Sequence, residues 1–64
     1  MTDLLTWKQV RDKTGMTQAE MARKLDISPQ LYQMKETYVR PMRVEEAVEI
    51  AKIAGVDLRR IKVA

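Results

Sequence analysis

Two helix starts and a short turn lie within the stretch Met16-Thr-Gln-Ala-Glu-Met-Ala-Arg-Lys-Leu-Asp-Ile-Ser-Pro-Gln30. The first start is a capping box, in which the Thr17 hydroxyl and the Glu20 carboxylate reciprocally satisfy free backbone N–H groups. The second is Ser28, a favoured N-cap residue, followed by Pro29 at the first helical position. The turn between the two predicted helices is about three or four residues long, a length that sets consecutive helices at a steep angle.

A further helix is predicted before this stretch. It runs from about Leu4 or Thr6 to Lys13, and Gly15 ends it. Trp7 lies at helical spacing among apolar neighbours, so we expect it to anchor the core rather than to stack on a nucleic-acid base.

Two more helices are predicted after the stretch. One runs from roughly Val44 to Ala54 and ends at Gly55; the other is short, lies within residues 56–61 and is capped by Asp57. The inward stripe of the longer helix is predicted to consist of Val44, Ala47, Val48 and Ala51. The sequence therefore predicts an all-α fold of five short helices.

The composition narrows the range of functions. The chain has 64 residues, neither cysteine nor histidine, and a net charge of +3. The absent residue types remove disulfides, thiolate and imidazole metal ligands, and the usual nucleophile and base pairs, so neither an enzyme nor a cofactor is expected. No apolar run is as long as a membrane span, and the N-terminal residues lack the features of a signal peptide, so we expect a cytosolic protein.

The charges are unevenly placed along the chain. Acidic residues gather at Glu45, Glu46 and Glu49, whereas basic residues are found at Arg40, Arg43, Arg59, Arg60 and Lys62. One basic face that meets a polyanion accounts for this distribution, and on charge alone an ordinary solvated surface does so equally well.

The stretch quoted above resembles the Cro and lambda-repressor-like (XRE-type) helix-turn-helix family, as does Ile50-Ala-Lys-Ile-Ala-Gly-Val-Asp-Leu58. The resemblance implies one DNA-binding domain over residues 1–64, with Thr17 to Tyr38 as the helix-turn-helix unit. It also implies that helix three of the five lies in the major groove, while the start of helix two and the loop after helix three hold phosphates.

The residues expected to contact DNA fall into two groups. The expected base-reading residues are Gln30, Tyr32 and Gln33. A glutamine such as Gln33 can contact N6 and N7 of adenine through both ends of its amide. The expected phosphate or positioning residues are Thr17, Gln18, Ser28, Lys35, Arg40 and Arg43.

Helix three can be read in two registers. Counted straight from Ile27, the buried positions are Tyr32 and Lys35, and a buried lysine is costly without a partner. In the other register the helix begins one residue later, and the core positions are Leu31, Met34 and Tyr38. We prefer this second register, which turns outward Gln30, Tyr32, Gln33 and Thr37. In it Lys35 and Glu36 lie on the flanks, and Glu36 repels phosphates unless it pairs or accepts from a cytosine N4.

Two other features depart from the family pattern. No glycine ends helix three, where the chain reads Thr37-Tyr-Val-Arg-Pro41, so the geometry of the following loop is left open. Ile53 stands where the family usually has a small residue. A partly exposed isoleucine there indicates a dimer seam, although local repacking is equally compatible.

The leading functional hypothesis is sequence-specific binding of duplex DNA. It describes a phage Cro-like repressor that binds an inverted repeat as a homodimer in the bacterial cytoplasm and nucleoid, without a small-molecule ligand or a membrane. The alternative is a protein-interaction module on the same fold, antitoxin-like or antirepressor-like. An enzyme is a distant third, because Glu45 and Glu49 lie one turn apart but are more simply a solvated face.

Overall fold

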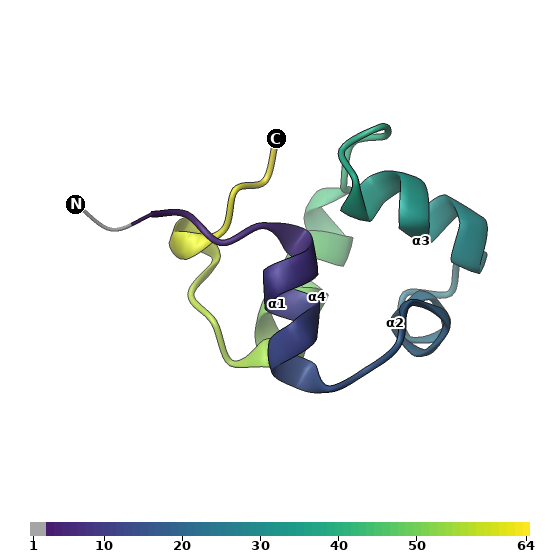
Figure 1. Ribbon diagram of the computed structural model, residues 1–64, viewed down its shortest axis with the longest axis horizontal. Helices are drawn as coiled ribbons and strands as arrows, with labels where there is room; N and C mark the ends of the chain where they lie inside the picture. Colours follow the sequence, from purple (N-terminus) through teal and green to yellow (C-terminus); the bar gives the residue numbers. More distant parts are fainter. Residues whose placement is uncertain (1–2) are drawn as a thin grey trace.

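The computed structural model describes residues 3–64, which form four α-helices and one short 3-10 helix (Figure 1). The elements are α1 (Trp7–Thr14), α2 (Gln18–Lys24), α3 (Pro29–Glu36), α4 (Val44–Ala54) and η1 (Leu58–Arg60). The all-α prediction is confirmed, and the only change in kind is that the fifth predicted helix is a 3-10 turn. Within residues 3–64, no helix has the length and apolar character needed to cross a membrane.

The starts of α1, α2 and α3 are fixed by hydroxyl side chains. Thr17 accepts the N–H of Glu20 at 3.1 Å and Glu20 accepts the N–H of Thr17 at 2.8 Å, which confirms the predicted capping box. Ser28 accepts the N–H of Leu31 at 3.1 Å, again as predicted. Thr6 begins α1 with a second capping box, since its hydroxyl accepts from the third residue of the helix.

The predicted tight turn joins α2 to α3. Figure 1 shows α2 nearly end-on while α3 runs across the view, so the two helices cross steeply. Asp26 takes a left-handed conformation with φ of 58°, and the N–H of Ile27 bonds to the carbonyl of Ala22 at 3.0 Å. Aspartate is among the few non-glycine residues that visit this region readily, so α2 can end and reverse within three residues.

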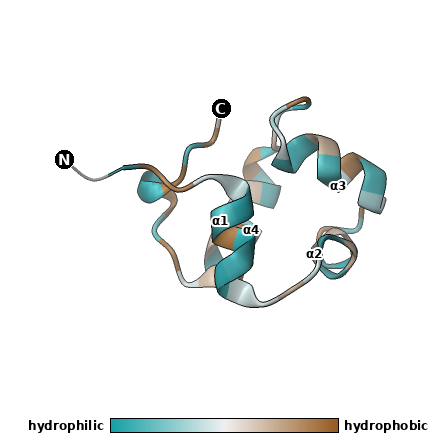
Figure 2. Cartoon of the chain, in the orientation of Figure 1, coloured by the Kyte–Doolittle hydropathy of each residue, from teal (hydrophilic) through white to brown (hydrophobic). Residues whose placement is uncertain are grey.

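The core lies where α1, α4 and the buried face of the α2–α3 unit meet. Its buried apolar side chains are Trp7, Val10, Met21, Ala22, Tyr32, Ala47, Ile50, Ala51 and Ile61. In Figure 2 most of the α1 ribbon is hydrophilic, and the buried residues of α1 are Trp7 and Val10, so this helix turns only a narrow apolar stripe inward.

The inward stripe of α4 differs from the predicted one. Val44 and Val48 are 73% and 37% exposed, so their predicted inward placement is wrong. The buried positions on α4 are Glu46, Ala47, Ile50 and Ala51. The helix is rotated toward Ile50 because this side chain offers more apolar area to bury than a valine.

The chain leaves α3 through a second left-handed turn, and here no glycine is used. Tyr38 has φ of 68°, and the N–H of Val39 bonds to the carbonyl of Met34 at 2.8 Å. The Tyr38 hydroxyl accepts the N–H of Trp7 at 3.2 Å and donates to the carbonyl of Lys62 at 2.5 Å. A left-handed conformation costs a residue of this kind about 1–2 kcal/mol, which these long-range contacts offset.

The two end segments of the described chain lie side by side. The N–H of Leu5 bonds to the carbonyl of Arg60 at 2.8 Å, and the N–H of Lys62 bonds to the carbonyl of Leu5 at 2.7 Å. These two bonds form an isolated parallel bridge between Leu5 and Ile61. The bridge holds the C-terminal segment where Tyr38 can reach it.

Candidate nucleic-acid interface

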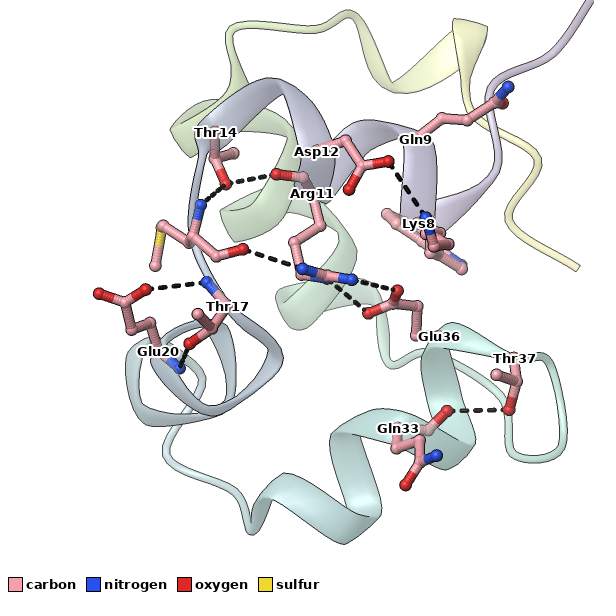
Figure 3. A network of polar contacts seen from close by, with 12 residues as sticks. Lys8, Gln9, Arg11, Asp12, Thr14, Thr17, Glu20, Gln33, Glu36 and Thr37 are labelled. Carbon is pink, nitrogen blue, oxygen red and sulfur yellow. Dashed lines mark hydrogen bonds and ion pairs between the residues drawn. The ribbon is translucent and has the colours of Figure 1, made fainter.

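The outer face of α3 carries polar side chains that solvent can reach. Gln30, Gln33 and Thr37 are all exposed, and their spacing of three and four residues places them on one side of the helix. The Thr37 hydroxyl donates to the carbonyl of Gln33 at 2.8 Å. Figure 3 shows the Gln33 amide pointing away from the contacts between α1 and α3. The structure therefore leaves two amide groups on this face able to meet a ligand.

The residues on the opposite face of α3 show that the register preferred in the sequence analysis is wrong. Tyr32 is fully buried and Lys35 is 6% exposed, so the count made straight from Ile27 is the right one. The prediction that Tyr32 reads bases is wrong, because its ring lies in the core. The large aromatic surface of Tyr32 favours burial, and Lys35 has a partner that the local sequence does not reveal.

The partner of Lys35 is Glu46 on α4. The Lys35 ammonium lies 2.5 Å from Oε1 of Glu46, and the side chains are 7% and 8% exposed. The same oxygen accepts the backbone N–H of Arg43 at 2.8 Å. Lys35 therefore cannot hold a phosphate as predicted, because its charge is buried and paired inside the protein.

Glu36 is also paired inside the protein. Its carboxylate accepts from Nε and a terminal nitrogen of Arg11 on α1, at 2.9 and 3.1 Å (Figure 3). The other terminal nitrogen of Arg11 donates to the carbonyl of Met16 at 2.9 Å. The hydrogen bond to Glu36 raises the pKa of Arg11 above its usual value. With its charge paired, Glu36 does not present a repelling carboxylate to DNA.

The Tyr32 hydroxyl lies beside this ion pair without a hydrogen bond of its own. Burial raises the pKa of the phenol, and the nearby Glu36 carboxylate adds to the effect. Tyr32 is therefore held in its neutral form, as a core side chain with an unpartnered polar end.

Three of the predicted phosphate-contacting residues lie at helix starts. Thr17 and Ser28 are exposed and Gln18 is half-buried. The hydroxyls of Thr17 and Ser28 cap their helices by accepting a backbone N–H. A hydroxyl that accepts in this way keeps its own hydrogen to donate, so capping and a phosphate contact are compatible.

The basic residues near α3 lie on both sides of it. Arg40 and Arg43 are exposed in the loop after α3, with the Arg43 guanidinium 3.5 Å from Glu45 on the surface. On the other side Arg23 of α2 is exposed and lines a shallow hollow with Pro29, the first residue of α3. Sequence reasoning missed Arg23, although an exposed basic residue on the helix that begins at the Thr17 capping box is a usable signal.

Arg11 and Glu46 were also missed as structural partners of the site, and a paired Glu36 was considered only as an alternative without a named partner. Arg11 follows Trp7 by four residues, so it shares the inward stripe of α1. A charged residue on such a stripe indicates a buried partner elsewhere, and the partner here is 25 residues away.

Comparison with known proteins gives one match. Residues 8–61 match a family model described as helix-turn-helix. No curated protein and no solved structure matches the sequence. The matched range begins at the second residue of α1 and runs past η1, so it contains the whole of α2, α3 and α4 and both capped starts of the α2–α3 unit.

Proposed function

The chain belongs to the XRE-type helix-turn-helix family of DNA-binding regulators, and on this basis we propose that it is a phage Cro-like repressor that recognises an operator sequence. The observation that carries the proposal is the exposed amide-bearing face of α3, on a helix whose opposite face is buried and ion-paired. Such a helix can enter the major groove as a rigid unit.

Base readout is assigned to Gln30 and Gln33. Each amide carries a donor and an acceptor, the pair of groups that adenine N7 and N6 match in the major groove. Thr37 lies one turn beyond Gln33 on the same face and is the third candidate. A bidentate contact of this kind contributes about 1–3 kcal/mol to discrimination between bases.

Phosphate contacts are assigned to the residues that border this face. Arg40 and Arg43 lie beyond the C-terminal end of α3, and Arg23 lies beside its N-terminal end. Thr17, Gln18 and Ser28 add uncharged donors at the helix starts. These contacts fix the orientation on the duplex without reading sequence, and they make the affinity fall with rising salt.

We propose that two copies of the repressor bind one inverted repeat, one copy on each half-site. The described chain measures 35 × 22 × 18 Å, and half-sites in such operators lie roughly 34 Å apart on one side of the duplex. Two copies of this size can therefore reach successive major grooves side by side. In this proposal residues 1–64 act as one domain without a cofactor or small-molecule ligand, in the cytoplasm of a bacterial cell, controlled by their own concentration.

Selection from a library of random duplexes, at two salt concentrations, tests the proposal. We expect enrichment of an inverted repeat and an affinity that decreases steeply as salt increases. If no sequence is enriched over a scrambled duplex at either salt concentration, the repressor proposal fails.

A second candidate function is a protein-interaction module. Val39 and Val63 are 70% and 49% exposed, and both line a shallow groove that also includes Tyr38 and Pro41. An apolar surface of this kind suits a protein partner. Binding that is insensitive to salt and is lost when Val39 is replaced by Ser favours this candidate over the repressor.

A further inference from the structure

Two consecutive residues on the buried face of α3 form ion pairs with two different helices. Lys35 pairs with Glu46 of α4, and Glu36 pairs with Arg11 of α1. In one ion pair α3 contributes the positive charge, and in the other it contributes the negative charge. Because the two pairs join neighbouring residues of α3 to different helices, together they resist rotation of α3 about its own axis.

Stability alone gives a poor account of the Lys35–Glu46 pair. Desolvating two charges costs several kcal/mol per ion, and replacing a buried pair with uncharged side chains of similar volume is often neutral or stabilising. Glu46 does more than pair with Lys35, because the same oxygen accepts the backbone N–H of Arg43. One carboxylate thus connects α3 with the loop that carries Arg40 and Arg43.

We infer that the Lys35–Glu46 pair is a positioning device for base readout, which sets the rotation of α3 relative to the phosphate-contacting loop. The inference rests on the proposed function. Lys35 and Glu46 are positioning residues, because both are buried behind the surface that meets DNA and act through Gln30, Gln33 and Arg43.

The size of the effect follows from helix geometry. Side-chain tips lie about 5–6 Å from a helix axis, so a rotation of about 20° moves a tip by roughly 2 Å. A hydrogen bond does not survive a shift of that size, because its donor and acceptor must stay within about 3 Å in good alignment. A small rotation therefore changes which base edges Gln30 and Gln33 can reach, while long, flexible arginines still reach phosphates.

The double variant K35M/E46Q removes the ion pair and leaves the rest of the site in place. Methionine has nearly the volume of lysine, and the glutamine oxygen can still accept the N–H of Arg43. We expect a similar midpoint of thermal unfolding and an unchanged dependence of affinity on salt. We also expect the preference for the selected operator over one changed at the base pair read by Gln33 to fall at least about fivefold.

The exposed ion pair between Lys8 and Asp12, at 3.4 Å, provides the matched control. The variant K8Q/D12N should retain the wild-type operator preference and the wild-type unfolding midpoint. Lys35→Arg is the second test variant, because it keeps a positive charge opposite Glu46 but requires a different side-chain geometry. It should alter operator preference even if the double variant does not fold.

The outcomes separate this inference from the proposed function. If the wild-type protein selects no sequence, both fail. If it selects an operator and both the double variant and Lys35→Arg keep the full preference, the positioning role is overturned while the repressor stands. A folded double variant that loses affinity equally for every duplex also overturns the positioning role.

Discussion

The two faces of α3 both carry polar side chains, but they differ in what those side chains contact. On the inner face Lys35 and Glu36 are nearly buried, and each has an oppositely charged partner on another helix. On the outer face Gln30 and Gln33 are exposed. Buried charges must be matched within the fold, whereas exposed amides remain available to a ligand. Removing one charge of an inner-face pair should therefore lower the free energy of unfolding, whereas substitutions on the outer face should change DNA recognition and leave that free energy nearly unchanged.

The largest effect is expected for Glu36→Gln on the inner face. It leaves the Arg11 guanidinium, whose side chain is 14% exposed, without its counter-charge. Removing one partner of such a pair lowers the free energy of unfolding by about 3–5 kcal/mol. Urea unfolding measures this loss. Glu49→Gln, at an exposed glutamate of α4, is the control and should change stability by no more than about 0.5 kcal/mol. Equal stability of the two variants contradicts the comparison.

Gln33→Ala tests the outer face. We expect a loss of about 1–3 kcal/mol in discrimination at one or two base pairs, because one bidentate amide is removed. The free energy of unfolding should stay within about 0.5 kcal/mol of the wild-type value. Affinity measurements on a set of singly substituted operators give the first quantity and urea unfolding the second. Equal weakening on every operator would mean that Gln33 reads no base.

Arg40 lies in the loop after α3, outside both faces, so Arg40→Ala tests a phosphate contact separately from base readout and from stability. Its removal should weaken binding to all duplexes alike and reduce the slope of log affinity against log salt by about one, because one phosphate contact is lost. Titrations at several salt concentrations measure the slope, with Gln33→Ala as the variant that leaves it unchanged. A change in base preference without a change in slope goes against this assignment.

The smallest effect is expected for Tyr32→Phe near neutral pH. The substitution removes a buried hydroxyl without a hydrogen bond, so stability should change by less than about 1 kcal/mol. The raised pKa of Tyr32 makes the folded state favour the neutral phenol. The contribution of Tyr32 is therefore fully present below its ordinary pKa near 10 and is lost as pH rises toward the raised value.

Unfolding measured from pH 8 to pH 11 tests this contribution. The wild-type protein should lose more stability over that range than Tyr32→Phe does. Parallel curves for the two proteins would show that Tyr32 ionises equally easily in the folded and unfolded states.

Residues close together in the sequence were sufficient to predict where the helices begin and end. The Thr17–Glu20 capping box, Ser28 before Pro29, and the bounds of α4 all depend on residues within a few positions of one another, and the structure confirms them. Because hydrogen bonds between nearby residues determine where a helix begins, these helix starts can be predicted from the sequence alone.

The rotation of α3 could not be predicted in the same way. A buried Lys35 is costly on its own, which made the outward register preferable, but its partner Glu46 lies 11 residues further along and on another helix. The left-handed Tyr38 is a similar case. Its stabilising partners are Trp7 and Lys62, which are 31 and 24 residues away.

The contact between Tyr38 and Lys62 also sets an order of events during synthesis. The ribosome adds Tyr38 before Lys62, and the 24 residues from Val39 to Lys62 take about 1–5 s to add. Until then the tyrosine that closes α3 lacks its C-terminal acceptor. The turn that closes α3 is thus completed only after Lys62 has been translated, so a nascent chain that stops short of this residue cannot form that turn with the contact that the folded protein has.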